Sequence, residues 1–508
     1  KDHLDSTAVS MECTASKGMS SLALQRRSSW ACRPRTAGVS LAHALWRPRT
    51  TTAAVRAAAT SPDREGARAV VVGGGPAGAL AAAYLGAQGW TVDVLERRPA
   101  APPSGQNFSH NITLNPRALT SLEGAGITPE TSPEWGEEEM ILQVKGSCTL
   151  DGDGEVMARP GKSSGLMRMA NWYALVQVIA RHCSRRLAER VAFHHGAAIT
   201  SIDLLARRVE AEVDGAPAGL GLEYDLLVGA DGVHSQVRKA MEAQVGGFTA
   251  GQVVNERAEF KTFVIPRRGD GTERMVFSHS SEVYPEIFAG PNPDGTKTAR
   301  LVLHADTERS FGALEAEEGG MEAFLRAHLA ALFEPEEGSL EAAARRMRRQ
   351  PARKESITTY CSRLHGPGVV LLGDAGHSMA PAMGMGANTA MEDSRRLAEL
   401  LGEEPNVAAL AGTAEFEGQL EGRLVRFTDA RLPALRTICT LSRTDFTKFA
   451  GKMWLKFYYG RLKLNQRAPL LFPKPAVSSL GDPLVPLEVV ARGMAREGAW
   501  NLAIMWAV

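Results

Sequence analysis

The sequence predicts an α/β protein in which two distant segments build one nucleotide-binding unit around an inserted antiparallel sheet. Three observations support this prediction. Glycine-rich motifs follow apolar segments at residues 73–78 and again at 373–393, and the chain from about 251 to 305 alternates short strand patterns with Gly, Pro and Asp turns. Two such motifs about 300 residues apart indicate a unit that closes over one large dinucleotide, for which FAD is the expected cofactor.

The first motif lies in a βαβ pattern. Residues 67–72 read as a buried strand, 76–88 as an alanine-rich helix, and 91–95 as a second strand that ends at Glu96. The glycines allow a tight turn and a close approach of backbone amides to a pyrophosphate, and the helix start favours its negative charge. Glu96, 18 residues after Gly78, is placed to accept hydrogen bonds from the adenosine ribose. The predicted cofactor contacts here are Gly73, Gly75, Pro76, Ala77, Gly78, Glu96 and Arg97.

The second motif follows the predicted strand 369–372 and precedes a predicted helix at 386–401. Asp374 is placed to bond a ribityl hydroxyl, and the glycines after it admit backbone amides close to phosphate and flavin. His377 is interpreted as a structural hydrogen-bonding residue. The predicted cofactor contacts are Gly373, Asp374, Pro381, Gly384, Gly386, Ala387 and Asn388.

Further helices are expected near 117–123, 171–190 and 321–333, and 334–348 is expected to be a charged, solvated segment.

The whole chain divides into five predicted parts. The predicted parts are a transit peptide or disordered segment at 1–57; a first FAD-binding part at 67–250, with a small substrate-side segment near 140–170; a substrate-binding β-sheet domain at 251–365; the returning FAD-binding part at 366–405; and a helical C-terminal region at 406–508.

The N-terminal segment has the composition of an organelle transit peptide. From Met11 to Thr60 it carries eight Lys or Arg residues and one acidic residue among many Ser, Thr and Ala. The sequence at 55–58 resembles a chloroplast processing site, so a chloroplast is the expected location. Mitochondrial import and a plain disordered basic tail are the alternatives. The chain opens with Lys1, and Met11 and Met19 are the candidate translation starts.

Composition excludes several classes of partner. Without residues 1–57 the chain has 49 Lys and Arg against 54 Asp and Glu, a mildly acidic balance that argues against nucleic-acid binding. The six cysteines show no metal-ligand or redox spacing, so free thiols and no metal site are expected. The sequence contains no run of 18 apolar residues, so a membrane span is not expected. The apolar end at 499–508 favours a packed helix, with peripheral membrane contact as the alternative.

Three ordered motifs, GGGPAG at 73–78, VGADGVHSQVR at 228–238 and GDAGHSMAPAMGMGANTAMED at 373–393, resemble those of the single-component FAD-dependent aromatic hydroxylases. The resemblance covers residues 67 to about 400 and implies a Rossmann-like, discontinuous (GR2-type) FAD domain. It gives Asp231 and Gly232 a dinucleotide-contact role, with Arg238 as a helper. The segment 110–126 and the C-terminal region resemble the kynurenine 3-monooxygenase group, which makes Arg117 a candidate flavin-side contact.

The resemblance implies a monooxygenase that uses NAD(P)H and O2 to hydroxylate an aromatic small molecule or epoxidise an unsaturated one. No second glycine motif is present for NAD(P)H, which fits a family whose nicotinamide cofactor binds transiently. The cofactor carries the difficult chemistry, so no catalytic side chain is predicted. The substrate is expected between the flavin near 381–386 and the sheet at 251–305.

The sequence departs from the family pattern at three places. Asn171 stands where the family has an arginine that opens a helix, with Arg168 nearby, so the residue that meets FAD there is open. Met385 replaces the usual glutamine and cannot hydrogen-bond like an amide. Residues 140–160 offer Lys145 and Arg159 but no tyrosine to anchor an amino-acid carboxylate, which argues against kynurenine as the substrate.

Two other functions fit the same motifs. Plastid flavin reductases or oxidases of isoprenoid metabolism, similar to geranylgeranyl reductase, share the architecture but normally lack the pattern of His377, Asn388 and the acidic pair at 392–393. A non-catalytic FAD-binding subunit of a plastid complex is the second alternative.

Overall fold

The computed structural model describes residues 66–100, 111–443 and 460–507, apart from short gaps. The predicted transit peptide at 1–57 and Lys145 lie outside the described residues. The gaps are at 129–130, 133–134, 136–140, 145, 151–155, 160–166, 215, 256–257, 267–273, 279–285, 293, 306, 334–337 and 355.

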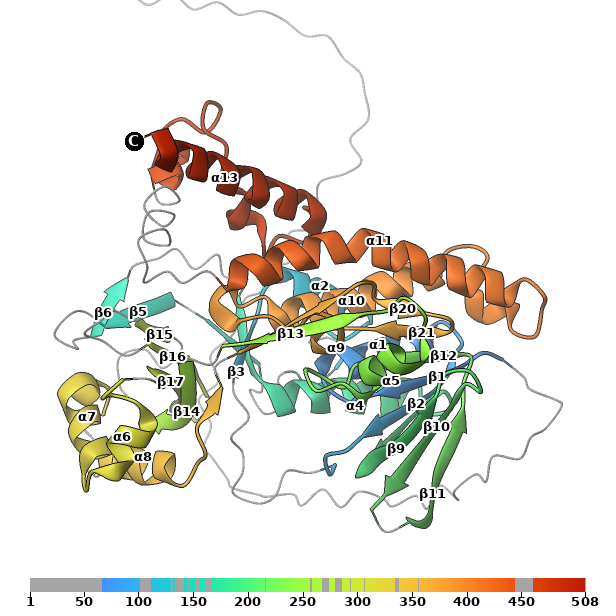
Figure 1. Ribbon diagram of the computed structural model, residues 1–508, viewed down its shortest axis with the longest axis horizontal. Coiled ribbons are helices and arrows are strands. Elements are labelled where there is room, and N and C mark those ends of the chain that lie inside the picture. Colours follow the sequence, from blue (N-terminus) through green and yellow to red (C-terminus); the bar gives the residue numbers. More distant parts are fainter. Residues whose placement is uncertain are drawn as a thin grey trace, which may run out of the picture. The chain divides into compact units, whose positions relative to one another are not determined.

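A six-stranded, mostly parallel sheet forms the centre of the nucleotide-binding unit (Figure 1). The sheet combines strands from residues 68–229 with strands from residues 365–371, as the two distant motifs predicted. The predicted α/β class is therefore confirmed. In spatial order the strands are β20 (His365–Gly366), β21 (Val369–Leu371), β12 (Leu226–Gly229), β1 (Arg68–Val72), β2 (Thr91–Glu96) and β8 (Val191–His195), and β20 alone is antiparallel.

Strand β1 is buried on both faces because its side chains alternate between two cores. Ala69 and Val71 belong to one apolar cluster, with helices α1 (Pro76–Ala87), α4 (Trp172–Arg186) and α10 (Gly386–Leu401). Val70 and Val72 belong to a second cluster, with α5 (Gln236–Gln244) and a small sheet of β9 (Ala197–Asp203), β10 (Arg208–Val213) and β11 (Ala216–Glu223). This continuous apolar run is typical of a central parallel strand.

A seven-stranded sheet forms the predicted substrate side. It is antiparallel except where β5 runs parallel to β15, so the segment near 140–170 supplies two of its strands. In order the strands are β18 (Arg353–Lys354), β14 (Ala258–Ile265), β17 (Lys297–His304), β16 (Glu286–Pro291), β15 (Arg274–Ser278), β5 (Gly146–Leu150) and β6 (Val156–Arg159). The domain boundaries predicted from the sequence stay predictions.

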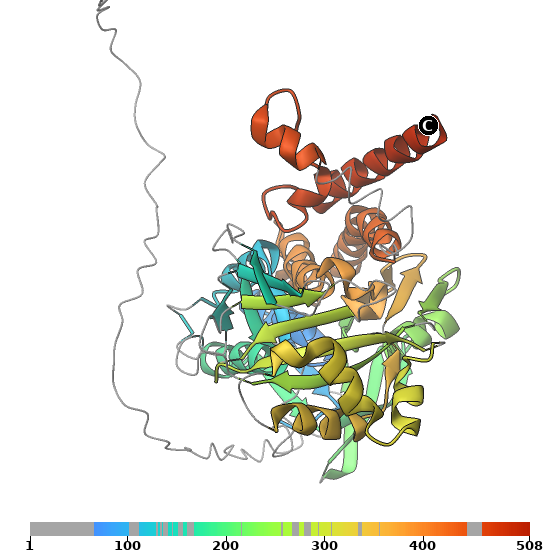
Figure 2. The same ribbon diagram turned by 90° about the vertical axis from the view of Figure 1, so that its left-hand side faces the viewer.

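Helices α6 (Phe311–Ala316), α7 (Gly320–Leu329) and α8 (Ser339–Arg348) lie on one face of this sheet, in yellow in Figure 2. The prediction that 334–348 is a solvated segment is wrong over α8. Leu340, Ala343, Ala344 and Met347 recur at helical spacing and are buried against the sheet, while Arg345 and Arg348 are exposed. The charge content of this short segment hid its amphipathic period.

Two small sheets join these units. Strand β3 (Asn111–Leu114) pairs with β7 (Arg168–Asn171), which also pairs with β4 (Ile141–Gln143). Strand β13 (Ala250–Val254) pairs with β19 (Ile357–Cys361), where the chain leaves and re-enters the nucleotide-binding unit.

The C-terminal region is helical. Its long helix α11 (Phe416–Ser442) contacts both α10 and α13 (Leu487–Ala507), as Figure 1 shows. Helix α2 (Pro116–Gly124), from the first part of the chain, also packs on α10. The short 3-10 helix η4 (Ala476–Ser479) packs against α13. Among the described residues, none of the helices combines the length and the apolar character needed to cross a membrane.

Candidate cofactor-binding site

The three sequence motifs meet because they follow three adjacent parallel strands. Strands β21, β12 and β1 are neighbours in the sheet, and the turns of the three motifs follow their ends at Gly373, Ala230 and Gly73. The carboxyl ends of parallel strands lie at one edge of a sheet, which is where α/β proteins bind nucleotides. Residues 300 positions apart in the chain therefore line one site.

Two glycines of the first turn, Gly73 and Gly78, have no room for a side chain. Gly73 has φ +101°, and a Cβ there would overlap the carbonyl of Ala230 on the neighbouring strand. A Cβ on Gly78 would overlap the carbonyl oxygen of Gly73. Helix α1 begins at Pro76, so the amides of its first turn, which have no partner within the helix, lie beside this bare turn. This is the cradle that a pyrophosphate requires.

Glu96, at the end of β2, supports the same turn. One carboxylate oxygen accepts a hydrogen bond from the Gly74 amide at 2.8 Å and the other from the Arg98 amide at 2.8 Å. The side chain is half-buried, and the neighbouring Arg97 is exposed. The structure thus places Glu96 and Arg97 next to the turn, and their contact with the cofactor stays a prediction.

The carboxylate of Asp231 caps helix α5. It accepts hydrogen bonds from the Ser235 hydroxyl at 2.5 Å and from the amides of Gln236 and Val237 at 2.5 and 3.2 Å. Burial raises the pKa of Asp231, and these hydrogen bonds oppose the rise. Gly232 follows with φ +79°. The dinucleotide contact inferred from the resemblance stays a prediction beside this capping role.

Arg238 ties the middle motif to the last one. Its guanidinium is buried and donates to the carbonyls of Val233 and Ala375, each at 2.7 Å. Because Val233 lies in the middle motif and Ala375 in the turn after β21, Arg238 links the backbones of the two motifs.

In the last motif, the backbone at position 373 requires a glycine, and the side chain of Asp374, the next residue, is accessible. Gly373 has φ 56° and ψ −139°, and a Cβ there would lie 2.8 Å from the Cβ of Ala390 in α10. The side chain of Asp374 is exposed, yet desolvation by the surrounding protein raises the pKa of its carboxyl, which His377 partly opposes. An accessible carboxyl in this position can bond a hydroxyl group of a bound molecule.

Asn388 fixes the loop before α10. Its buried amide donates to the carbonyls of Thr113 and Gly384, both at 2.8 Å, and its oxygen accepts from the Asn115 amide at 2.8 Å. Gly384 has φ +60° and is exposed, as is Pro381, while Gly386 and Ala387 are half-buried at the start of the helix. Asn388 therefore holds the exposed loop in place through strand β3.

The departures from the family pattern have local explanations. The oxygen of Asn171 accepts hydrogen bonds from the amides of Tyr173 and Ala174 and so caps α4. Arg168 is half-buried in β7, and burial lowers its pKa. The side chain of Met385 is 2% exposed, belongs to the apolar core and meets the Asn115 amide nitrogen at 3.5 Å. Met385 thus packs in the apolar core, and whether it contacts the flavin stays a prediction to be tested.

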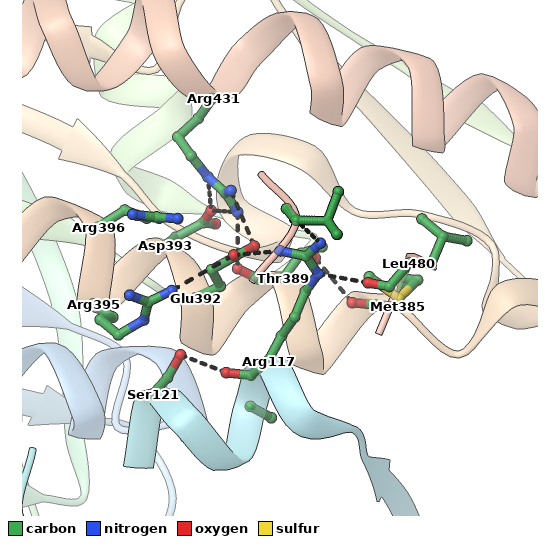
Figure 3. Close-up of polar contacts among 12 residues, drawn as sticks. Arg117, Ser121, Met385, Thr389, Glu392, Asp393, Arg395, Arg396, Arg431 and Leu480 are labelled. Carbon is green, nitrogen blue, oxygen red and sulfur yellow. Dashed lines mark hydrogen bonds and ion pairs between the residues drawn. The ribbon is translucent and has the colours of Figure 1, made fainter. Parts of the chain in front are cut away.

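Arg117 lies in a set of buried ionisable side chains that we term the buried charge cluster: Arg117, His377, Glu392, Asp393 and Arg431. Figure 3 shows Arg117, Glu392, Asp393 and Arg431. The Arg117 guanidinium is fully buried and donates to Glu392 at 2.7 Å and to the carbonyls of Leu480 and Val485 at 2.5 and 2.6 Å. Its nitrogens are occupied by these protein partners. A flavin-side contact of Arg117 stays a prediction that this geometry does not favour.

Sequence reasoning missed Arg431 and assigned no role to Glu392 or Asp393. A signal for Arg431 was present, because it falls on the apolar stripe of α11 with Leu424, Phe427, Leu435 and Ile438, all of which are buried. A charged residue at a core position of a helix requires a buried partner.

Comparison with known proteins supports the cofactor. Residues 67–417 match the family described as FAD binding domain. The chain belongs to this family. It is 29% identical to kynurenine 3-monooxygenase of Salinispora arenicola over 81% of this chain and 86% of the relative. It is 26% identical to violacein synthase of Chromobacterium violaceum over 85% and 98%. The tetrameric form of 2-methyl-3-hydroxypyridine-5-carboxylic acid oxygenase is similar in fold, with a TM-score of 0.56 at 22% identity over 83% and 98% of the two chains.

The residues present fit FAD. The bare glycine turn before α1, the glycine turn after β21 and the accessible Asp374 supply backbone amides for phosphate and a carboxyl for a hydroxyl group. The protein is accordingly a flavoprotein oxidoreductase of the FAD-dependent aromatic hydroxylase type, a monooxygenase, and NAD(P)H is the co-substrate typical of this family.

Proposed function

We propose that this protein uses NAD(P)H and O2 to hydroxylate an aromatic small molecule, with epoxidation of an unsaturated one as the variant reaction. The observation that carries the proposal is the double attachment of strand β3. One end of β3 is bonded to Asn388 beside the loop at 381–386, and the other end is bonded to the seven-stranded sheet. Near its C-terminal end Thr113 and Asn115 bond Asn388. At its N-terminal end the buried Asn111 donates to the carbonyls of Gly290 and Pro291 at 3.1 and 3.0 Å.

This connection puts the expected flavin position and the sheet on one rigid support. FAD supplies the redox chemistry and the reaction with O2 when it is bound. The chain's own contribution is to orient the substrate and keep water away from the reacting atoms. Close to the sheet end of β3 lies a small apolar cluster of Val144, Met169 and Met275, with Met167 and Phe288 packed against it. Thioether and aromatic groups favour contact with an apolar ring.

The same features bear on the substrate class. Curated relatives include kynurenine 3-monooxygenases, but this chain lacks a tyrosine between 140 and 160 for the amino-acid carboxylate. We therefore propose an aromatic substrate other than kynurenine, with phenolic and indolic compounds as the first to test.

Purified protein tests the proposal. It should be yellow, contain FAD, and oxidise NADPH or NADH faster when the correct aromatic compound is added. With ¹⁸O2, one labelled oxygen atom should appear in the product. Protein that retains FAD but shows neither substrate-stimulated oxidation nor label incorporation across the panel would refute the hydroxylase proposal, and protein that takes up no FAD would refute any flavoenzyme.

We further propose peripheral membrane contact through the C-terminal region. Leu470, Leu471 and Phe472 are 98%, 77% and 40% exposed, and Arg467 and Lys474 flank them. Exposed apolar residues between basic ones are typical of segments that dock on anionic lipid surfaces. Co-sedimentation with anionic vesicles should fall when Leu470 and Leu471 are both replaced by Asp, and equal sedimentation would refute this contact.

Chloroplast import through residues 1–57 is also proposed, on the basic, Ser- and Ala-rich composition of that segment. Import of the full chain and of a chain beginning at residue 58 into isolated chloroplasts and mitochondria would decide between the two organelles. Import of both chains alike would refute the transit peptide.

A further inference from the structure

Arg431 occupies a position where a charge must be paired. It is 3% exposed on the apolar stripe of α11. Its guanidinium meets both acidic residues of α10 (Figure 3): Nε and Nη2 donate to Asp393 Oδ1 at 2.9 and 2.7 Å, and Nη1 donates to Glu392 Oε2 at 3.0 Å. Forked contacts of this kind fix the orientation of a carboxylate.

The second oxygen of Asp393 reaches the cofactor motif. Asp393 Oδ2 accepts hydrogen bonds from the Gly373 amide at 3.1 Å and from His377 Nε2. One carboxylate therefore has the α11 guanidinium on one oxygen and the first amide of the turn after β21 on the other. Burial alone would raise the pKa of Asp393, but His377 and Arg431 outweigh it and lower the pKa. Asp393 consequently stays ionised as an acceptor.

The turn that Asp393 holds is the one expected to meet FAD. Gly373 adopts φ 56° and ψ −139°, a conformation open in practice to glycine alone, and it packs on Ala390. The orientation of its peptide depends on the hydrogen bond to Asp393 because the glycine itself has great backbone freedom. The next residue is the accessible Asp374.

We propose that Arg431 is a positioning residue for FAD, which acts through Asp393 to hold Gly373 and Asp374 in the geometry that the cofactor requires. The inference rests on the proposed contact of FAD with Gly373 and Asp374. The C-terminal region thereby becomes part of the cofactor site without touching the cofactor. Loss of the guanidinium leaves Asp393 with a buried charge and fewer donors, so its carboxylate turns or takes up a proton and releases the Gly373 amide.

The test compares Arg431→Met with Arg423→Met. Arg423 is a matched control because it lies two turns earlier in the same helix, is 6% exposed, and donates to the Leu400 carbonyl at 2.5 Å and to Glu403 at 3.2 Å. Each substitution removes one buried arginine from α11. The FAD dissociation constant, the visible circular dichroism of bound flavin at saturating FAD and the unfolding temperature are measured for both.

We expect Arg431→Met to weaken FAD binding about tenfold, the equivalent of about 1.4 kcal/mol, and to alter the flavin dichroism. Arg423→Met should lower the unfolding temperature but leave both flavin readouts unchanged. Asp393→Asn, which keeps the side-chain shape but replaces an acceptor with a donor, should reproduce the Arg431→Met result. If Arg431→Met does not fold, Asp393→Asn is measured in its place and the same outcomes decide.

Equal flavin affinity and equal dichroism in the wild type, Arg431→Met and Asp393→Asn would overturn the inference. Asp374→Asn separates this failure from a wrong cofactor position. If Asp374→Asn weakens FAD binding and the Arg431 variant does not, only the positioning role fails. If Asp374→Asn also binds FAD as the wild type does, the proposed contact at Asp374 fails and the inference fails with it.

Discussion

Replacement of Arg117 by Met is expected to destabilise the protein while leaving the flavin spectrum unchanged. The guanidinium is fully buried and bonds Glu392 and the carbonyls of Leu480 and Val485. Breaking a buried ion pair costs about 3–5 kcal/mol, and an orphaned buried carbonyl costs about 1–3 kcal/mol. Glu392 keeps Arg431 as a partner at 3.0 Å, so the low end applies to the pair. A total of about 4 kcal/mol follows.

Thermal unfolding measures this loss. At roughly 2.1 cal/mol/K per residue, the roughly 370 residues that the structure describes have an unfolding entropy of about 0.8 kcal/mol/K, so about 4 kcal/mol lowers the midpoint by about 5 °C. Arg426→Met is the control, because Arg426 forms an exposed ion pair with Glu403 at 2.7 Å and should change the midpoint far less. If Arg117→Met unfolds like Arg426→Met but loses FAD or shifts its spectrum, Arg117 is a flavin contact and the structural reasoning is refuted.

Three further results are expected. Gly78→Ala should yield protein without FAD, because the new Cβ overlaps the Gly73 carbonyl, whereas Gly418→Ala, which meets open space in α11, should keep its flavin content; equal content in both would contradict the cradle. Burial alone would raise the pKa of Glu392, but Arg431 and Arg117 lower it, and the pKa of Asp393 is lowered as well. Both carboxyls therefore contribute stability at neutral pH that is lost as the pH falls below their ordinary pKa values of 4.5 and 3.8, and Glu392→Gln should flatten the acid side of a plot of unfolding temperature against pH. Met385→Gln should cost about 1–3 kcal/mol of stability because it buries an amide and should leave the flavin spectrum unchanged, whereas a spectral shift would place that side chain beside the flavin.

The sequence could predict the sheet and the three motifs because each is a local pattern. A buried parallel strand is a short apolar run, and a glycine turn directly after it is visible without tertiary information. The predicted strand at 369–372 is found as β21 at Val369–Leu371, and the predicted helix at 386–401 is found as α10. The position of β12 between β21 and β1 could not be predicted in this way, because β2 and β8 also follow β1 in the chain and lie on its other side.

The buried charge cluster could not be predicted because its partners are far apart in the sequence. Arg117 and Glu392 are separated by 275 positions, and no local rule pairs one buried arginine with one of many acidic residues. Asn171 shows a different limit. The family resemblance directed attention to a missing arginine, whereas the observed role is a helix cap, which is a local signal that a motif comparison overlooks.

These contacts change which groups are expected to bind FAD, from side chains to backbone amides. Glu96, Asp231, Asn388 and Arg117 were predicted to meet the cofactor, yet the side chain of each already has hydrogen-bond partners within the protein. The first-turn amides of α1 and the glycine turns need no such side chain to bind a cofactor, and the carboxyl of Asp374 is accessible. Backbone amides bind phosphate without a side chain, and their position depends on how firmly the turns are held. Cofactor affinity in this protein should therefore be more sensitive to the residues that hold the turns, such as Gly78, Glu96 and Asp393, than to the charge of Arg117.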